Sequence, residues 1–112
     1  MKRILKFRAY TEISNEVLGM KYDVPHNYND TVMQFTGLLD RHGKEIYEED
    51  IVFDEDGEYS KTCIITWNDE SGGFFGKSIE DDDSFSMVEI DGQIIGNIYE
   101  NPNLLSIQPS QD

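Results

Sequence analysis

Apolar and polar residues alternate along several short segments of the chain. Over residues 3–10, Leu5, Phe7 and Ala9 alternate with Lys6 and Arg8, which gives one apolar and one charged face. A period of two residues is typical of a half-buried β-strand. Further runs predict strands near residues 17–21, 32–36, 46–53, 62–67, 85–90 and 94–99. No segment carries a helical stripe of ten residues or more, and only residues 103–106 suggest a single helical turn.

Turn residues separate these apolar runs. Gly37 is expected to end the strand at 32–36, and Asp40 and Gly43 are expected to form the turn that follows. Two Asp-Gly pairs, at 56–57 and 91–92, lie between apolar runs and each predict a β-hairpin.

Closely spaced short strands with turns between them predict a mainly β fold, a small barrel or sandwich with little helix. The 112 residues suit one domain, 1–112. An alternative division has two small β subdomains that share a core, residues 1–36 with the C-terminal strands and residues 37–90.

The net charge is −14, from 23 acidic and 9 basic residues. Proteins that bind nucleic acid directly need lysines and arginines to replace the counterions of the phosphates. Direct binding to DNA, RNA or an anionic membrane is therefore not expected, and a basic protein is the more suitable partner. Acidity also keeps small proteins soluble, which is a sufficient explanation by itself.

No apolar run approaches the roughly 20 residues that cross a bilayer. The N-terminus begins with positive charge, but Lys6 and Arg8 interrupt the apolar segment that a signal peptide requires. We therefore expect a cytoplasmic protein.

The sequence predicts no catalytic residue, cofactor or metal site, and hence no enzyme. Cys63 stands in an apolar run and is expected to be a small buried hydrophobe. His26 and His42 have no partner at the spacing of metal ligands. The carboxylates between residues 45 and 58 lack the alternate spacing and central glycine of a calcium loop.

Three segments of the chain form motifs at its beginning, middle and end. Residues 33–52 read MQFTGLLDRHGKEIYEEDIV, residues 94–102 read IIGNIYENP, and residues 6–10 read KFRAY. Together, and in this order along the chain, they resemble the YopX family of phage and prophage proteins. The residues of these motifs are expected to stabilise the fold. Gly96 is expected to mark a bulge or a close backbone approach, and Asn97 is expected to form a hydrogen bond to a nearby turn.

The resemblance implies a phage or prophage gene of a Gram-positive host and a β-rich fold able to form oligomers. It transfers no catalytic residues, because the family has no established activity. One departure concerns the segment Glu48-Glu49-Asp50, where the family has Glu-Gly-Asp. If the glycine serves a turn with positive φ, Glu49 is strained there.

A candidate interaction surface combines acidic clusters with an aromatic pair. Tyr and Trp are enriched where proteins bind one another, and adjacent residues on a strand point to opposite faces, so one of the two phenylalanines is expected to reach solvent or a subunit interface. The surface comprises Glu48, Glu49, Asp50, Asp54, Glu55, Asp56, Glu80, Asp81, Asp82, Asp83, Phe74 and Phe75.

Three functions are compatible with these features. The first is a non-enzymatic phage accessory protein that binds a basic host protein, with carboxylates in place of nucleic-acid phosphates. The second is an oligomer that captures a nucleotide or other small molecule, for which Lys2, Lys6 and Arg8 offer the only phosphate site in the sequence. The third is a structural protein whose basic first strand and acidic loops join copies into a homo-oligomer.

Overall fold

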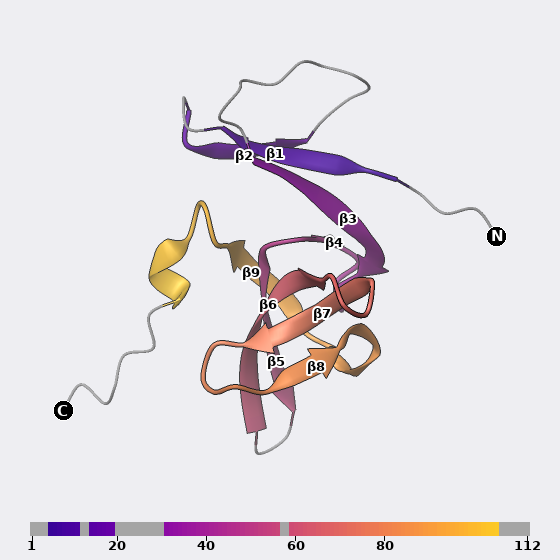
Figure 1. Cartoon of the computed structure of the whole chain (residues 1–112). Helices are drawn as coiled ribbons and strands as arrows, with labels where there is room; N and C mark the ends of the chain where they lie inside the picture. Colours follow the sequence, from indigo (N-terminus) through magenta and orange to yellow (C-terminus); the bar gives the residue numbers. More distant parts are fainter. Residues whose placement is uncertain (1–4, 12–13, 20–30, 57–58, 106–112) are drawn as a thin grey trace.

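The computed structural model describes residues 5–11, 14–19, 31–56 and 59–105 and contains two antiparallel sheets (Figure 1). The first has the strand order β2-β1-β3-β4, and the second β8-β7-β6-β5-β9. The only helical segments among the described residues are two short 3-10 helices, η1 and η2, so the fold is mainly β, as predicted. The elements are β1 Phe7–Thr11, β2 Glu16–Gly19, β3 Thr31–Leu39, β4 Glu45–Tyr47, β5 Asp50–Asp56, β6 Tyr59–Asn68, β7 Gly73–Ser78, β8 Ser84–Ser86, η1 Met87–Glu89, β9 Gln93–Asn97 and η2 Pro102–Leu105.

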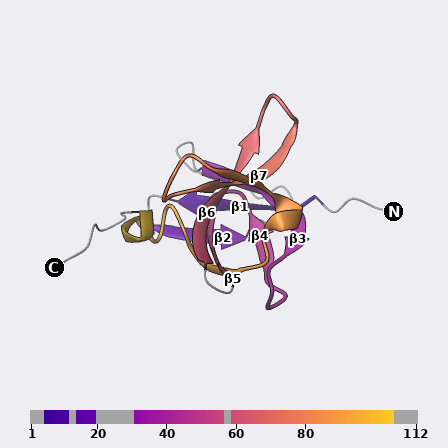
Figure 2. The same ribbon diagram turned by 90° about the horizontal axis from the view of Figure 1, so that it is seen from below.

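The second sheet curls into a half-barrel. Figure 2 looks into it, with β5, β6 and β7 around the opening and β3 and β4 completing the ring. The hairpin of β1 and β2 lies across one end of this half-barrel, at the top of Figure 1. Strand β3 belongs to the hairpin sheet at its beginning and reaches the half-barrel at its end, so it ties the two parts together.

The core of the half-barrel is apolar. Ile46, Val52 and Ile65 form a buried cluster, and partly buried side chains from η1 and β9 pack against it. Cys63 is fully buried, as the sequence predicts, and burial raises the pKa of its thiol to about 11. A thiol with so high a pKa stays protonated at neutral pH and is a poor nucleophile.

Strand β3 is longer than predicted. It continues through Gly37 to Leu39, whereas the sequence predicted that it ends at Gly37. Gly37 has a φ of +91° and lies where the pairing with β4 shifts register between Phe35 and Leu39. The glycine therefore serves a bulge within the strand, because only a residue without a side chain takes this conformation at little cost.

The predicted turn at residues 40–43 is confirmed. Oδ1 of Asp40 accepts the N–H groups of His42 and Lys44, both at 2.8 Å. Its Oδ2 accepts the N–H of Ile94 in β9 at 3.0 Å, so the same side chain fixes the turn to the second sheet. Although burial acts to raise it, these three N–H donors hold the pKa of Asp40 below its usual range.

Of the two predicted hairpins, the first is confirmed and the second is wrong. β5 pairs with β6 up to Asp56 and Tyr59, and its Asp-Gly turn extends beyond the described residues at Gly57. β9 pairs with β5, while β8 pairs with β7. A Cβ on Gly92 would lie 2.3 Å from the carbonyl oxygen of Phe53. The second Asp-Gly pair therefore lets the chain pass close to β5, and it does not reverse the chain between neighbouring strands.

The sheets also bear on the two subdomains considered from the sequence. Strands of residues 7–47 form the first sheet and strands of residues 50–97 form the second, which includes the C-terminal strand β9.

None of the described helical segments could span a lipid bilayer.

Candidate functional site at the junction of the two sheets

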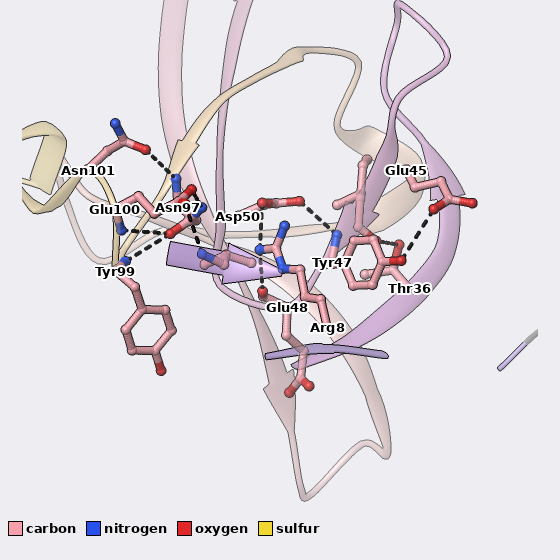
Figure 3. Close-up of polar contacts among 12 residues, drawn as sticks. Arg8, Thr36, Glu45, Tyr47, Glu48, Asp50, Asn97, Tyr99, Glu100 and Asn101 are labelled. Carbon is pink, nitrogen blue, oxygen red and sulfur yellow. Dashed lines mark hydrogen bonds and ion pairs between the residues drawn. The ribbon is translucent and has the colours of Figure 1, made fainter. Parts of the chain in front are cut away.

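The three motif segments meet where the β1–β2 hairpin lies on the half-barrel (Figure 3). Arg8 comes from β1, Asp50 from the start of β5, and Asn97 from the end of β9. Asp50 and Asn97 are direct partners in the β5–β9 ladder, so antiparallel pairing brings the middle and C-terminal motifs side by side. Arg8 then joins the N-terminal motif to the middle one, and the ring of Tyr10, stacked on that of Tyr99 at 4.8 Å between centroids, joins it to the C-terminal one.

An ion pair between Arg8 and Asp50 is the centre of the junction. Nη2 of Arg8 donates to Oδ1 of Asp50 at 2.7 Å and to the carbonyl oxygen of Glu48 at 3.1 Å. The guanidinium also lies 4.7 Å from the ring centroid of Tyr47. The Arg8 and Asp50 side chains are 13% and 1% exposed. Arg8 is therefore buried, because the charged face of β1 turns toward the second sheet at this position.

The site supplies a hydrogen-bond partner to each oxygen of the buried Asp50 carboxyl group. Burial raises the pKa of its carboxyl above the ordinary value of 3.8, while Arg8 and the N–H of Tyr47 act in the opposite direction. That N–H donates to Oδ2 at 2.8 Å, so both oxygens are engaged. A buried carboxylate with both oxygens satisfied is tolerated, whereas one without its partner costs several kcal/mol, roughly 3–5.

Asn97 organises the chain after β9, as predicted. Its Oδ1 accepts the N–H groups of Tyr99 and Glu100, and its Nδ2 donates to Oε1 of Glu100 at 2.8 Å. Oε2 of Glu100 accepts the N–H of Val17 in β2 at 2.9 Å. The turn after β9 thus holds the edge strand of the first sheet. The predicted close approach at Gly96 is confirmed, because a Cβ there would lie 2.4 Å from Oδ1 of Asn101.

A cavity of about 410 Å³ opens beside this network. Its walls come from both sheets, from β1 and β2 on one side and from β9 and the turn after it on the other. Four charged side chains line it: Arg8, Lys44, Asp50 and Glu100. Within the described ranges, no three His, Cys, Asp or Glu side chains lie close enough together to hold a metal ion.

The predicted acidic surface divides into buried and exposed carboxylates. Asp50 and Asp54 are buried, and Asp54 accepts the N–H of Asp91 at 3.1 Å. Glu48 is half-buried, with Oε1 accepting the N–H of Gln34 at 2.8 Å. Glu55 and residues 80–83 are exposed. The side chain of Asp56 lies outside the described residues.

Phe74 and Phe75 are both half-buried and lie away from the exposed acids. Phe74 packs edge-on against Trp67, with ring centroids 5.0 Å apart, and contacts the core cluster. Glu80 bonds to Thr62, five residues before Trp67 on β6. At roughly 3.3 Å per residue, the acidic loop and the aromatic pair are separated by about 17 Å along the strand. The structure does not bring these two parts of the predicted surface together.

Glu49 adopts the strained conformation that its position in the motif implies. Its φ is +71°, in the left-handed region that favours glycine. Its N–H donates to the carbonyl oxygen of Ile65 at 2.7 Å and its own carbonyl oxygen accepts from Ile98 at 3.1 Å, which fixes the turn. Burial raises the pKa of Glu49 above 4.5, and the neighbouring Glu48 adds to the effect.

In the sequence, Arg8 and Asp50 stand out only as members of charged clusters, and Asp40 only as a turn residue. Neither the ion pair of Arg8 with Asp50 nor the bond from Asp40 to β9 is predicted. All three residues lie in the motif segments, and this position could have indicated a partner within the fold, since charged residues within apolar motifs often have one.

Comparison with known proteins agrees with the resemblance seen in the sequence. The family described as YopX protein matches residues 8–106. Protein EF1440 from Enterococcus faecalis has a similar crystal structure, with a TM-score of 0.62, 26% identity, and coverage of 94% of this chain and 100% of that one. No curated protein matches the chain.

Replacing Arg8 with methionine is expected to lower the free energy of unfolding by about 3–5 kcal/mol, because the Asp50 carboxylate stays buried without its cation. The double variant R8M/D50N should recover at least about 1 kcal/mol of this loss, since a neutral amide oxygen still accepts the N–H of Tyr47. Urea unfolding at neutral pH measures both. A double variant no more stable than Arg8→Met would show that the two side chains are not coupled.

Replacing Glu49 with glycine is expected to raise the free energy of unfolding by about 1 kcal/mol, because glycine takes positive φ without strain. The variant Glu49→Gln removes the charge of the side chain but keeps the strained backbone, so it separates the two effects. A raised pKa in the folded state means that stability is lost as pH rises above the ordinary carboxyl range, so the gain from Glu49→Gln should be larger at about pH 7 than at pH 4. Thermal unfolding at both pH values measures this, and a glycine variant less stable than wild type would contradict the strain.

Proposed function

The chain belongs to the YopX family, and from this premise we propose that it is a non-enzymatic accessory protein of a phage or prophage that binds a basic host protein. The observation that supports this proposal best is a cluster of exposed carboxylates at one end of the half-barrel. We call this cluster the acidic end and define it as Glu55 with residues 80–83.

Two segments far apart in the sequence form the acidic end. Glu55 lies near the end of β5 and pairs with Ser60 at the start of β6. On the other side of β6, the N–H of Thr62 donates to Oε1 of Glu80 at 3.1 Å, and the N–H of Ile79 donates to the carbonyl oxygen of Thr62 at 3.0 Å. The β5–β6 hairpin and the β7–β8 loop therefore expose their carboxylates at the same end of β6.

Three of these carboxylates have no intramolecular partner among the described residues: those of Glu55, Asp82 and Asp83. Lys61, the one basic residue of β6, is already 3.9 Å from Oδ2 of Asp54 and 4.1 Å from the Phe85 ring centroid. Uncompensated surface carboxylates attract lysine and arginine side chains at long range and give complexes that weaken with salt. A host protein with a basic groove for nucleic acid has the complementary surface.

The alternative of phosphate capture by the first strand is less well supported. Nζ of Lys6 donates to Oε2 of Glu45, and Arg8 is paired with Asp50. Both cations are thus neutralised within the chain, while Lys2 lies outside the described residues.

Self-association is a second candidate function, because the outer face of the first sheet is apolar. Ala9 is the direct partner of Leu18 on one side and of Val32 on the other, so these three side chains share a face with Phe7. Leu18, Val32 and Phe7 are 50%, 40% and 39% exposed. Glu16, which pairs with Thr11 at the edge of this face, is the one acidic residue of β1, β2 and β3, so the face suits contact between two otherwise repelling acidic chains.

Neutralising the acidic end with E55Q/D82N/D83N is expected to abolish retention of basic proteins from host lysate at low salt, because the Coulombic attraction is lost. The matched control E16Q/D69N/E70Q removes three exposed acids elsewhere and should retain them. Affinity capture at low and high salt, read by mass spectrometry, measures both. If wild type retains no basic host protein at low salt, or if both triple variants behave alike, the proposal fails.

Replacing Leu18 with glutamate is expected to convert an oligomer to a monomer, because a charge would then be buried in the apolar contact. Val88 is 91% exposed, so Val88→Glu adds the same charge at a different apolar position. Light scattering should give wild type and Val88→Glu at least twice the mass of one chain, more so at high salt, which screens the repulsion. A monomeric wild type at all salt concentrations contradicts self-association.

A further inference from the structure

Among the side-chain groups that line the cavity at the junction, the oxygens have hydrogen-bond partners while several donors have none among the described residues. The carboxylate and side-chain amide oxygens of the cavity's lining residues are bonded within the protein. Asp50 accepts from Arg8 and Tyr47, and Glu100 accepts from Asn97 and Val17, so each carboxylate has both oxygens bonded. The carbonyl oxygen of the Asn101 side chain is also engaged, by the N–H of Asn97 at 3.1 Å.

Three donors on residues that line the same cavity have no partner within the described part of the chain. Because Oδ1 of Asn101 faces the N–H of Asn97, its Nδ2 is the free end of the amide, and it has no partner in the described part of the chain. Lys44 is exposed at the cavity, and its ammonium likewise has no acceptor among the described residues. Nε of Arg8 is buried and has no acceptor either.

The residues that line the cavity carry no net formal charge, so an anion is repelled less there than elsewhere on this acidic protein. Arg8 and Lys44 balance Asp50 and Glu100, so the cavity is neutral within a chain of net charge −14. Charges beyond about 10 Å are largely screened at 0.1 M salt, so an anion in the cavity interacts mainly with this lining. A ligand that supplies acceptors and a negative charge matches the donors that remain.

We propose that this cavity binds a small organic acid, with its carboxylate or phosphate group accepting from Lys44 and Asn101. Both head groups are oxyanions that accept from ammonium and amide donors, which is the chemistry the free donors require. Val17, Ile94 and Ile95 give the cavity apolar walls for the body of the ligand. Its volume of about 410 Å³ lies in the range of sites for small molecules, roughly 300–1,000 Å³.

The site is independent of the proposed protein partner, because it lies at the junction of the sheets and uses none of the residues of the acidic end. It also differs from a phosphate site on the paired cations of the first strand, since Lys44 follows the turn before β4. The hairpin and the turn after β9 contribute opposite walls, so a bound acid would strengthen the contact between the two sheets.

The test uses three probes with the same ring and different head groups: benzoate, phenyl phosphate and benzamide. Dialysed full-length protein is heated with each probe at concentrations up to about 10 mM, and binding to the folded state raises the midpoint of unfolding. We expect a saturable rise with benzoate, phenyl phosphate or both, and none with neutral benzamide. The responses of the first two distinguish a carboxylate from a phosphate site.

Two variants with the same change of charge locate the site. Lys44→Gln should weaken binding of the responding anion at least about tenfold, which is 1.4 kcal/mol. Lys77→Gln removes an exposed lysine on β7, away from the cavity, and should leave binding unchanged. The proposal is overturned if neither anion gives a saturable rise, if benzamide acts equally, or if both variants lose binding alike. Any of these results leaves the capture of basic proteins by the acidic end unaffected.

Discussion

The buried ion pair between Arg8 and Asp50 determines how the two sheets of this protein are arranged. Moving two charges out of water is costly, and their attraction compensates only in a well-defined geometry. The guanidinium also bonds the carbonyl oxygen of Glu48 and lies over Tyr47, so β1 has one favourable position over the start of β5. Asp50 extends this constraint to β9 through its ladder partner Asn97. One charged contact therefore coordinates three segments that are far apart in the sequence.

The sequence was a good guide to local structure. Alternation placed most strands, Asp40 marked its turn, and Gly96 and Cys63 behaved as their neighbours suggested. It was a poor guide to pairing, because a period of two residues identifies the faces of a strand but not its neighbours. Thus the apolar run before the Asp-Gly pair at 91–92 looked like the partner of β9, although β9 pairs with β5. The alternation in β1 likewise leaves the environment of its charged face open, since an arginine with a buried partner cannot be distinguished by pattern alone.

The candidate sites show the same limit. Asp54 and Glu55 are adjacent in sequence, yet Asp54 is buried and bonded, while Glu55 is exposed and has no partner among the described residues. Clustering in the sequence identifies where acids are abundant, but only the fold decides which oxygens are already occupied. The junction cavity was inaccessible to sequence reasoning for this reason. Its chemistry depends on which donors remain after Asn97, Glu100 and Asp50 have bonded their neighbours.

The single cysteine has a practical consequence. Because Cys63 lies within the half-barrel, with its thiol protonated at neutral pH, reagents such as maleimides can reach it only when the strands separate. The rate of alkylation in the native state therefore reports how often the half-barrel opens. The chain contains its own label for measuring that motion, without any engineered residue.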